Sequence, residues 1–253
     1  MKRAELHRTI RKSHRYLGVT LGVQFLFWTL GGLYFSWSDL DDVHGDHQKA
    51  HIHPIRGNIQ LAPLSDVLQK LKAKDSVNFI FDTHLVQILS EPIYQIIYSK
   101  EHDRGKKIQL ANAVSGELRP ALSRTEATQV AQSSFTDEAK VKSVEYLTTT
   151  NGHHEYRKEP LPAYAITFDH PSNTTVYVST QLGTVQKFRN NKWRVFDVLW
   201  MLHTMDYQTR DHFGNWVLRA FSVLGLITVF SGFWLFWLSR KKKIIKPSPV
   251  SKH

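Results

Sequence analysis

The 253-residue chain contains no cysteine, and this absence excludes both disulfide bonds and a thiol nucleophile. Two hydrolase signatures are also missing, since neither G-x-S-x-G nor H-E-x-x-H occurs in the sequence. No G-x-G-x-x-G motif follows a predicted strand, so a nicotinamide or flavin site of that type is excluded. The sequence therefore identifies no catalytic nucleophile and no nucleotide cofactor.

Charged residues are absent from two long apolar stretches, 16–37 and 220–238. About 20 apolar residues cross the hydrocarbon core of a bilayer as an α-helix, so both stretches are predicted to span a membrane. The first is longer than the apolar region of a cleaved signal peptide, and no small-x-small cleavage site follows it. We therefore expect it to be a retained anchor.

The formal charge of +11 is carried entirely by the residues before 16 and after 238, and the chain between them is neutral. An excess of Lys and Arg marks the cytoplasmic side of a membrane protein, so both termini are predicted to be cytoplasmic. The basic ends favour anionic headgroups of the lipid bilayer as partners. Nucleic acid is not predicted, because it would need a basic patch on the neutral middle of the chain.

Small residues recur along one face of each apolar stretch. Gly18, Gly22 and Gly32 fall at helical spacing with their neighbours in the first stretch, and Gly225 and Gly232 do so in the second. Faces of this kind let helix backbones approach closely in a bilayer. The two spans are antiparallel if both termini are cytoplasmic, so these faces could pack within one chain or form the seam of a homodimer.

Residues 58–192 predict an α+β domain in which one unit occurs twice, at 61–118 and 121–188. Each unit opens with an amphipathic helical pattern and continues with three β-rich runs joined by turn-prone residues. The motif P-x-Y-x-I begins at Pro92 in the first unit and at Pro162 in the second. Each unit alone is small for an independent core, so we expect one compact domain.

A glycine turn, at Gly116 or Gly183, follows the last β-rich run of each unit. The units differ chiefly at 148–162, where TTTNGHHEYRKEPLP predicts a longer hairpin tip in the second unit. The helix, the strands, the Y-x-I motif and the glycine turn together resemble the PepSY domain.

The flanking stretches carry a more specific resemblance. The run RKSHRYLG at 11–18 leads into the first apolar stretch, and LHT at 202–204 precedes the second, which closes with SGFWLFWLSRK at 231–241. These patterns resemble the helices of the PepSY-associated transmembrane family. The resemblance implies an α+β extracytoplasmic domain, made of two PepSY-like repeats of a helix plus three strands and flanked by two transmembrane α-helices.

This resemblance and the charge pattern together divide the chain into seven parts. They are a basic cytoplasmic N-terminus at 1–15, transmembrane helix 1 at 16–38, a His/Asp-rich juxtamembrane linker at 39–57, the PepSY-like domain at 58–192, an amphipathic interfacial helix at 193–213, transmembrane helix 2 at 214–239 and a basic cytoplasmic tail at 240–253. The family implies a bacterial cytoplasmic (inner) membrane, with residues 39–213 on the periplasmic side.

Two different functions follow from the resemblance. Larger members of the family are tied to iron acquisition, and some reduce ferric siderophores with haem b held by helix histidines. An iron-handling role would need a quinol or a cytochrome as electron donor. Other proteins with isolated PepSY units restrain peptidases, which implies a non-enzymatic module that binds a periplasmic protein or peptide. This chain has two predicted spans where the larger members have four or more, so both functions stay open.

Two histidines beside the spans are candidate haem ligands. His14 precedes the first span and His203 precedes the second, and about 30 Å of hydrocarbon separates these levels, so they cannot ligate one haem within a chain. His14 could pair with the same residue of a second chain. His203 could pair with His44 or His47, which also lie close to the outer surface.

The stretch DDVHGDHQKAHIHP at 41–54 holds four histidines and three aspartates. His47, His51, His53 and Asp46 offer nitrogen and oxygen donors that suit Zn²⁺, Cu²⁺, Ni²⁺ or iron. Their spacing matches no established metal motif. The competing interpretation is a solvated collar between the first span and the domain.

Overall fold

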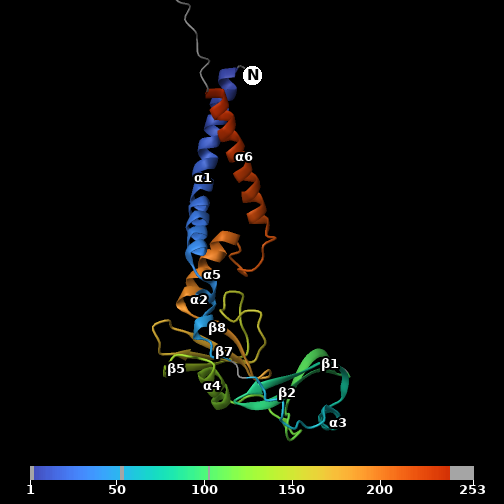
Figure 1. Cartoon of the computed structure of the whole chain (residues 1–253). Helices are drawn as coiled ribbons and strands as arrows, with labels where there is room; N and C mark the ends of the chain where they lie inside the picture. The colour runs from blue at the N-terminus through green and yellow to red at the C-terminus, as the bar shows by residue number, and fades with distance from the viewer. Residues whose placement is uncertain (1–2, 52–53, 102, 240–253) are drawn as a thin grey trace, which may run out of the picture. The chain divides into compact units, whose positions relative to one another are not determined.

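The computed structural model describes residues 3–51, 54–101 and 103–239 (Figure 1). It confirms a mixed α+β fold, with an apolar helix near each end of the chain and two antiparallel sheets between them in sequence. The chain divides into two compact units: a terminal unit, formed by the residues up to Ser36 and from Leu199 onward, and a middle unit, Trp37–Val198. The predicted tail at 240–253 lies outside the described residues.

Helices α1 (Arg3–Trp37) and α6 (Trp216–Ser239) dominate the terminal unit. The segments Arg8–Trp37 and Trp216–Ser239 are long and apolar enough to cross a membrane. Only 17% and 11% of their most apolar 18-residue parts are buried, which argues against core helices of a soluble protein. Helix α1 begins well before the predicted span, because no glycine or proline interrupts residues 3–15.

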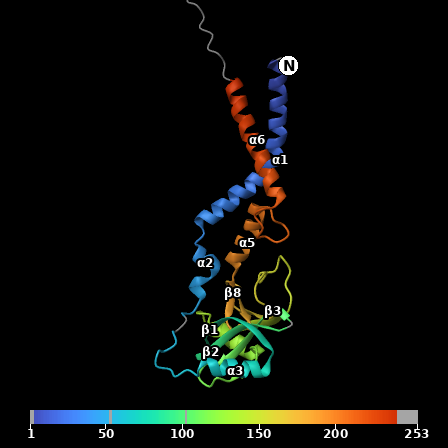
Figure 2. The same cartoon turned by 90° about the vertical axis from the view of Figure 1, so that its right-hand side faces the viewer.

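Within the terminal unit, α1 and α6 lie side by side and antiparallel (Figures 1 and 2). Nδ1 of His14 lies 2.8 Å from Oγ of Ser231, and a Cβ atom added to Gly225 would lie 3.3 Å from Cζ of Phe25. The earlier residue of α1, His14, thus meets the later residue of α6, Ser231, and the later residue Phe25 meets the earlier Gly225, as antiparallel helices require.

The predicted face of α1, which also carries Phe25, meets α6 through Phe25 and not through its glycines. Gly225 and Gly232 of α6 do lie against α1, but Cβ atoms added to Gly18, Gly22 and Gly32 would meet nothing within 4 Å among the described residues. The buried positions Leu21, Gln24 and Gly31 lie beside this row. Two of them meet α5 (Asn191–Thr204): Nε2 of Gln24 donates to the backbone oxygen of Leu202 at 2.6 Å, and a Cβ atom added to Gly31 would lie 3.9 Å from that of Leu199. A homodimer seam on the glycine face stays a prediction.

In the middle unit, a helix followed by an antiparallel sheet occurs twice. The first half consists of α3 (Leu64–Lys74), β1 (Val77–Ile88), β2 (Glu91–Lys100), β3 (Asp103–Asn112) and β4 (Leu118–Arg119). The second half consists of α4 (Arg124–Ser133), β5 (Val141–Leu147), β6 (Ala163–Phe168), β7 (Thr175–Ser179) and β8 (Val185–Arg189). In both sheets the spatial order of the strands is their order in the chain.

The prediction of three strands in each half is wrong, because each sheet has four. Gly116 and Gly183 have φ values of +69° and +71°, in the left-handed region that glycine adopts without strain. At these glycines the chain reverses and returns along the preceding strand as β4 or β8. Each run predicted as one long strand is therefore a strand, a turn and a second strand.

The two halves share a pattern of backbone hydrogen bonds. In the first half, the N–H of Ala62 donates to the oxygen of Ala113, whose own N–H donates to the oxygen of Pro92. In the second half, the N–H of Leu122 donates to the oxygen of Thr180, whose own N–H donates to the oxygen of Pro162. In both halves the bonds tie the residue ahead of the helix to the turn, and the turn to the proline of P-x-Y-x-I. The sequence repeat thus corresponds to a repeated local geometry.

One hydrophobic core joins the two halves. It contains Ile88, Ile93 and Leu110 from the first sheet together with Ile166 and Phe168 from the second, all at most 2% exposed. Because side chains of both sheets share this core, the halves form one compact unit.

The predicted linker at 39–57 is ordered over much of its length. Helix α2 (Leu40–His44) and the 3₁₀ helix η1 (Asp46–Gln48) bury the side chains of Val43 and Gln48. Nε2 of Gln48 donates to Oγ of Ser172 at 3.1 Å, and its Oε1 accepts from the Thr174 hydroxyl at 2.7 Å. A solvated collar therefore does not describe this segment, which packs on the second half of the middle unit.

Two further predicted segments differ from the structure. Helix α5 (Asn191–Thr204) ends nine residues before the expected 213, because Met205 has a φ of +52° and the chain then folds around the Asp206 carboxylate. The predicted hairpin tip at 148–162 folds back onto the second sheet. There the fully buried Tyr156 ring stacks on Tyr177, with centroids 4.9 Å apart.

Candidate functional site

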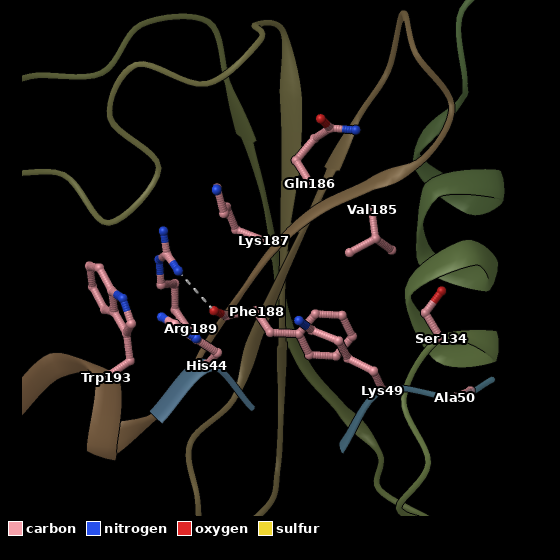
Figure 3. A pocket seen from close by; sticks show the side chains of 10 residues that line it. All are labelled: His44, Lys49, Ala50, Ser134, Val185, Gln186, Lys187, Phe188, Arg189 and Trp193. Atoms are coloured by element: carbon pink, nitrogen blue, oxygen red, sulfur yellow. Dashed lines mark hydrogen bonds between the residues drawn. The ribbon is translucent and has the colours of Figure 1, made fainter. Parts of the chain in front are cut away.

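A cavity of about 510 Å³ lies within the middle unit, beside strand β8 (Figure 3). Strand β8 forms one wall, and the segment around α2 and η1 forms another. The lining residues are His44, Lys49, Ala50, Ser134, Val185, Gln186, Lys187, Phe188, Arg189 and Trp193. The cavity is thus built from parts of the chain that are more than 130 positions apart.

Local interactions of the 39–50 segment set the position of the wall opposite β8. Asp39 caps α2 by accepting from the N–H of Asp41, and Gly45 ends the helix with a φ of +70°. Nδ2 of Asn190, the residue after β8, donates to the backbone oxygen of Asp42 at 2.9 Å. These bonds place His44 and Lys49 on the cavity.

Cationic side chains dominate the lining. His44, Lys49, Lys187 and Arg189 contribute nitrogen groups, and the lining includes no carboxylate. Lys49 forms an exposed ion pair with Asp46, and Lys187 lies 3.0 Å from Glu159. The exposed pair of Lys49 contributes little free energy, so this lysine remains available to a competing anion, whereas the pair of Lys187 is partly buried.

Among the Lys and Arg side chains that line the cavity, Arg189 differs from Lys49 and Lys187 in having no ion pair within the described structure. Its Nε donates to the backbone oxygen of Glu155 at 3.1 Å and its Nη1 to that of Phe188 at 3.2 Å. No carboxylate among the described residues lies within ion-pair distance of its guanidinium. Partial burial lowers the pKa of Arg189 to about 10, against the attraction of Tyr177, Glu155 and Glu159. A half-buried cation without a carboxylate at ion-pair distance can still accept a closer anion, so this position favours binding of an anion.

The carboxylate of Glu155 binds groups other than Arg189. Glu155 accepts from Nε of Arg194 at 2.5 Å and from the Tyr177 hydroxyl at 3.3 Å. Trp193 covers Arg189 instead, with the guanidinium carbon 3.9 Å from the ring centroid. The indole face attracts the cation but cannot neutralise it.

The predicted haem ligands of the spans lie in the terminal unit and do not meet. His14 contacts Ser231, whereas His203, on the last turn of α5, packs against Trp28 and Phe35. Trp28 is 14 residues beyond His14 on α1, which is about 21 Å of helix. The expectation that the two histidines cannot share one haem within a chain agrees with this placement.

His203 has an unusual environment. Its ring centroid lies 5.6 Å from that of Trp28, 6.0 Å from that of Phe35 and 6.2 Å from that of Trp200. Its Nδ1 is buried and has no hydrogen-bond partner within the described part of the chain. Buried ring nitrogens are normally paired, so this one could accept a further ligand.

The predicted metal ligands are dispersed. His44 lines the cavity, Nδ1 of His47 lies 3.2 Å from Asp42, Asp46 pairs with Lys49, and His51 lines a smaller pocket. His53 lies outside the described residues. Across residues 3–51, 54–101 and 103–239, no three His, Asp or Glu side chains gather as a metal site would require. Metal binding by the histidine-rich stretch stays a prediction.

Sequence reasoning missed Lys187, Arg189 and Trp193. A signal was present in KFRNNKWR at 187–194, which combines four cations and two aromatic rings with no acidic residue. Read locally, such a run predicts a solvated basic surface, because nothing in it shows that Arg189 is half-buried and lines a cavity.

The chain was compared with known proteins at three levels. No family model matches it, and neither a curated protein nor a solved structure does so.

Proposed function

We propose that this protein is a membrane-anchored binding protein without catalytic activity of its own, and that it holds an anionic ligand in the cavity beside β8. The observation that carries the proposal is Arg189, a half-buried cation that lines the cavity without a carboxylate at ion-pair distance among the described residues. The flanking cations Lys49 and Lys187 support the same ligand charge, and the His44 imidazole adds a hydrogen-bonding group to the lining.

The membrane part of the proposal rests on α1 and α6. We propose that they cross the inner membrane with both termini in the cytoplasm, which places residues 39–213 outside it. The assignment to the PepSY type belongs to the same proposal. The repeated helix-and-sheet halves, the two glycine turns and the shared hydrogen bonds from Pro92 and Pro162 support it.

The test uses dansyl-glutamate, a small dicarboxylate with an aromatic body, and the full chain in lipid nanodiscs. Fluorescence polarisation would measure the affinity, with empty nanodiscs as background. Arg189→Gln should weaken binding by about tenfold or more, because a charge-assisted hydrogen bond is lost. Lys142→Gln removes the same charge from an exposed position of β5 outside the cavity and should leave the affinity unchanged. Saturable binding that both variants retain equally, or no binding at all, would refute the proposal.

A second function, haem-dependent iron handling, is favoured by the buried and unpartnered Nδ1 of His203. A buried imidazole between aromatic rings fits the apolar surroundings of a haem, so His203 would supply one axial ligand. Haem b would supply a redox-active iron for reduction of a ferric siderophore, with electrons from a quinol or a cytochrome. His14 is not proposed as the second ligand of this haem, because it lies about 21 Å of helix away from Trp28, the neighbour of His203.

A dithionite-reduced minus oxidised spectrum tests this second function. The full chain would be purified in mild detergent from haem-replete cells. A sharp b-type α-band that disappears in His203→Ala and persists in His153→Ala, which changes an exposed loop histidine, would support it. A flat spectrum at good protein yield would remove haem from consideration and leave the anion-binding protein.

A further inference from the structure

Strand β8 has a free edge that faces the cavity. It is the last strand of the order β5-β6-β7-β8, so one side pairs with β7 and no described strand pairs with the other. The cavity is lined by all five residues of β8, Val185–Arg189. Successive side chains of a strand point to opposite faces of the sheet. A cavity that touches five successive residues therefore contacts both faces and runs along the edge of the strand.

The length of this edge suits a short extended peptide. Five residues of strand span about 16 Å. The opposite wall is formed by His44, Lys49 and Ala50, which belong to no strand of the sheet. The space between the two walls therefore offers the edge of β8 to an incoming chain, which would compete with the side chains of Arg189 and Arg194 for the backbone oxygens of Phe188 and Arg189.

The charge along the edge indicates which peptide would fit. Lys187 and Arg189 are two residues apart and project to the same side of β8 (Figure 3). A strand that adds to β8 would place its own alternate side chains on that side. Acidic residues at every second position would meet both cations, and His44 and Lys49 lie across the cavity from them.

We infer that the cavity receives an extended acidic segment of a partner protein, which adds to β8 as a fifth strand with alternate Asp or Glu side chains facing Lys187 and Arg189. This inference rests on the proposed anion-binding function and names the class of its ligand. Backbone hydrogen bonds to the edge would supply affinity, and the cationic pair would select the acidic register.

The test compares peptides on the full chain in nanodiscs by fluorescence anisotropy. The probe is a fluorescein-labelled octapeptide of alternating Glu and Val, and its Lys-Val counterpart is the charge control. Two further probes carry N-methyl groups on all Glu nitrogens or on all Val nitrogens. These two sets of N–H groups lie on opposite edges of an extended peptide. Arg189→Gln and Lys142→Gln serve as the matched protein variants.

Strand addition predicts that the Glu-Val peptide binds and the Lys-Val peptide does not. One N-methylated peptide should lose about tenfold or more in affinity while the other retains it, because one edge alone pairs with β8. Equal binding of both N-methylated peptides, or binding of dansyl-glutamate without any peptide binding, would overturn strand addition and leave the anion site intact. Failure of both dansyl-glutamate and the peptides would overturn the proposed function as well.

Discussion

The guanidinium of Arg189 stacks on the indole of Trp193, with 3.9 Å between the guanidinium carbon and the ring centroid. The two residues belong to different elements, β8 and α5, and Trp193 is 8% exposed. The ring holds the cation at the edge of the cavity without giving it a counter-charge. Trp193 is therefore a positioning residue for the proposed anion site.

Replacement of Trp193 should weaken ligand binding and stability together. Trp193→Ala removes a buried ring and should cost about 3 to 5 kcal/mol of unfolding free energy, whereas Trp193→Phe keeps an aromatic face and should cost less. Thermal unfolding of the full chain and dansyl-glutamate polarisation would measure the two effects. Unchanged dansyl-glutamate affinity in folded Trp193→Phe and Trp193→Ala proteins would mean that the indole does not position Arg189.

Gly183 and Gly116 provide a matched pair for the turns of the two halves. Both have φ near +70°, so an alanine at either position carries the left-handed penalty of about 1 to 2 kcal/mol. At Gly183 the added Cβ would also lie 2.3 Å from Cδ1 of Ile88, whereas at Gly116 the nearest atom, Cβ of Ala62, is 3.2 Å away. Gly183→Ala should therefore lower the Tm more than Gly116→Ala.

A second substitution separates the two causes at Gly183. Ile88→Val removes the Cδ1 atom and should recover part of the Tm lost in Gly183→Ala, although alone it is destabilising. If the double variant is as unstable as the sum of the single variants, the contact between Ile88 and Gly183 does not explain the effect.

Gln48 should be the principal anchor of the 39–50 segment. Gln48→Leu leaves the buried Thr174 hydroxyl without its acceptor, which should cost about 1 to 3 kcal/mol and increase hydrogen exchange in residues 40–50. Asp46→Asn, which breaks only an exposed pair with Lys49, should cost less than about 1 kcal/mol. Similar exchange rates in the two variants would contradict this assignment.

Asp206 should make the stability of the loop after α5 depend on pH. Burial acts to raise the pKa of its carboxyl, but the Thr209 hydroxyl and the N–H groups of His212, Thr209 and Gln208 outweigh burial and hold the pKa well below the ordinary value. A depressed folded-state pKa contributes stability that is complete above the unfolded pKa, about 4, and declines as the pH falls toward the folded one.

The Tm difference between the wild type and Asp206→Asn measures this contribution. It should be constant between about pH 5 and 8 and should shrink below about pH 4, where the unfolded carboxyl becomes protonated. A difference that stays the same down to the lowest accessible pH would show that the Asp206 charge contributes nothing.

The absence of cysteine allows a direct test of the α1–α6 contact. His14→Cys with Ser231→Cys should be joined within the chain by a short bifunctional thiol reagent, because the native side chains are in contact and a cysteine is shorter than a histidine, and maleimide labelling should then fall in most molecules. Gly18→Cys with Ser231→Cys should react less, since Gly18 lies one helical turn beyond His14 and a Cβ atom there meets no described atom within 4 Å. Efficient crosslinking of the second pair would place the helices differently. Gly18→Cys alone, by forming a disulfide between chains, would report the predicted homodimer seam.

Local sequence was sufficient for the apolar helices and for the repeated helix-and-strand halves. A long run without charge and a period of two or 3.6 residues are properties of neighbouring side chains, so they can be seen without the fold. The glycine turns were visible for the same reason, but the short strand β4 was not. Its existence depends on pairing with β3, which a linear pattern does not contain.

The candidate site was decided by tertiary structure alone. In the sequence, Arg189 belongs to a basic run that looks solvated, and His44 and Lys49 belong to a stretch that looks like a metal site or a flexible collar. Folding brings these distant segments to one cavity and half-buries the arginine, whose Nε and Nη1 donate to backbone oxygens. Charge and periodicity are properties of each residue and its sequence neighbours. The burial of a charged side chain and the identity of its hydrogen-bond partners depend on which remote segments pack together.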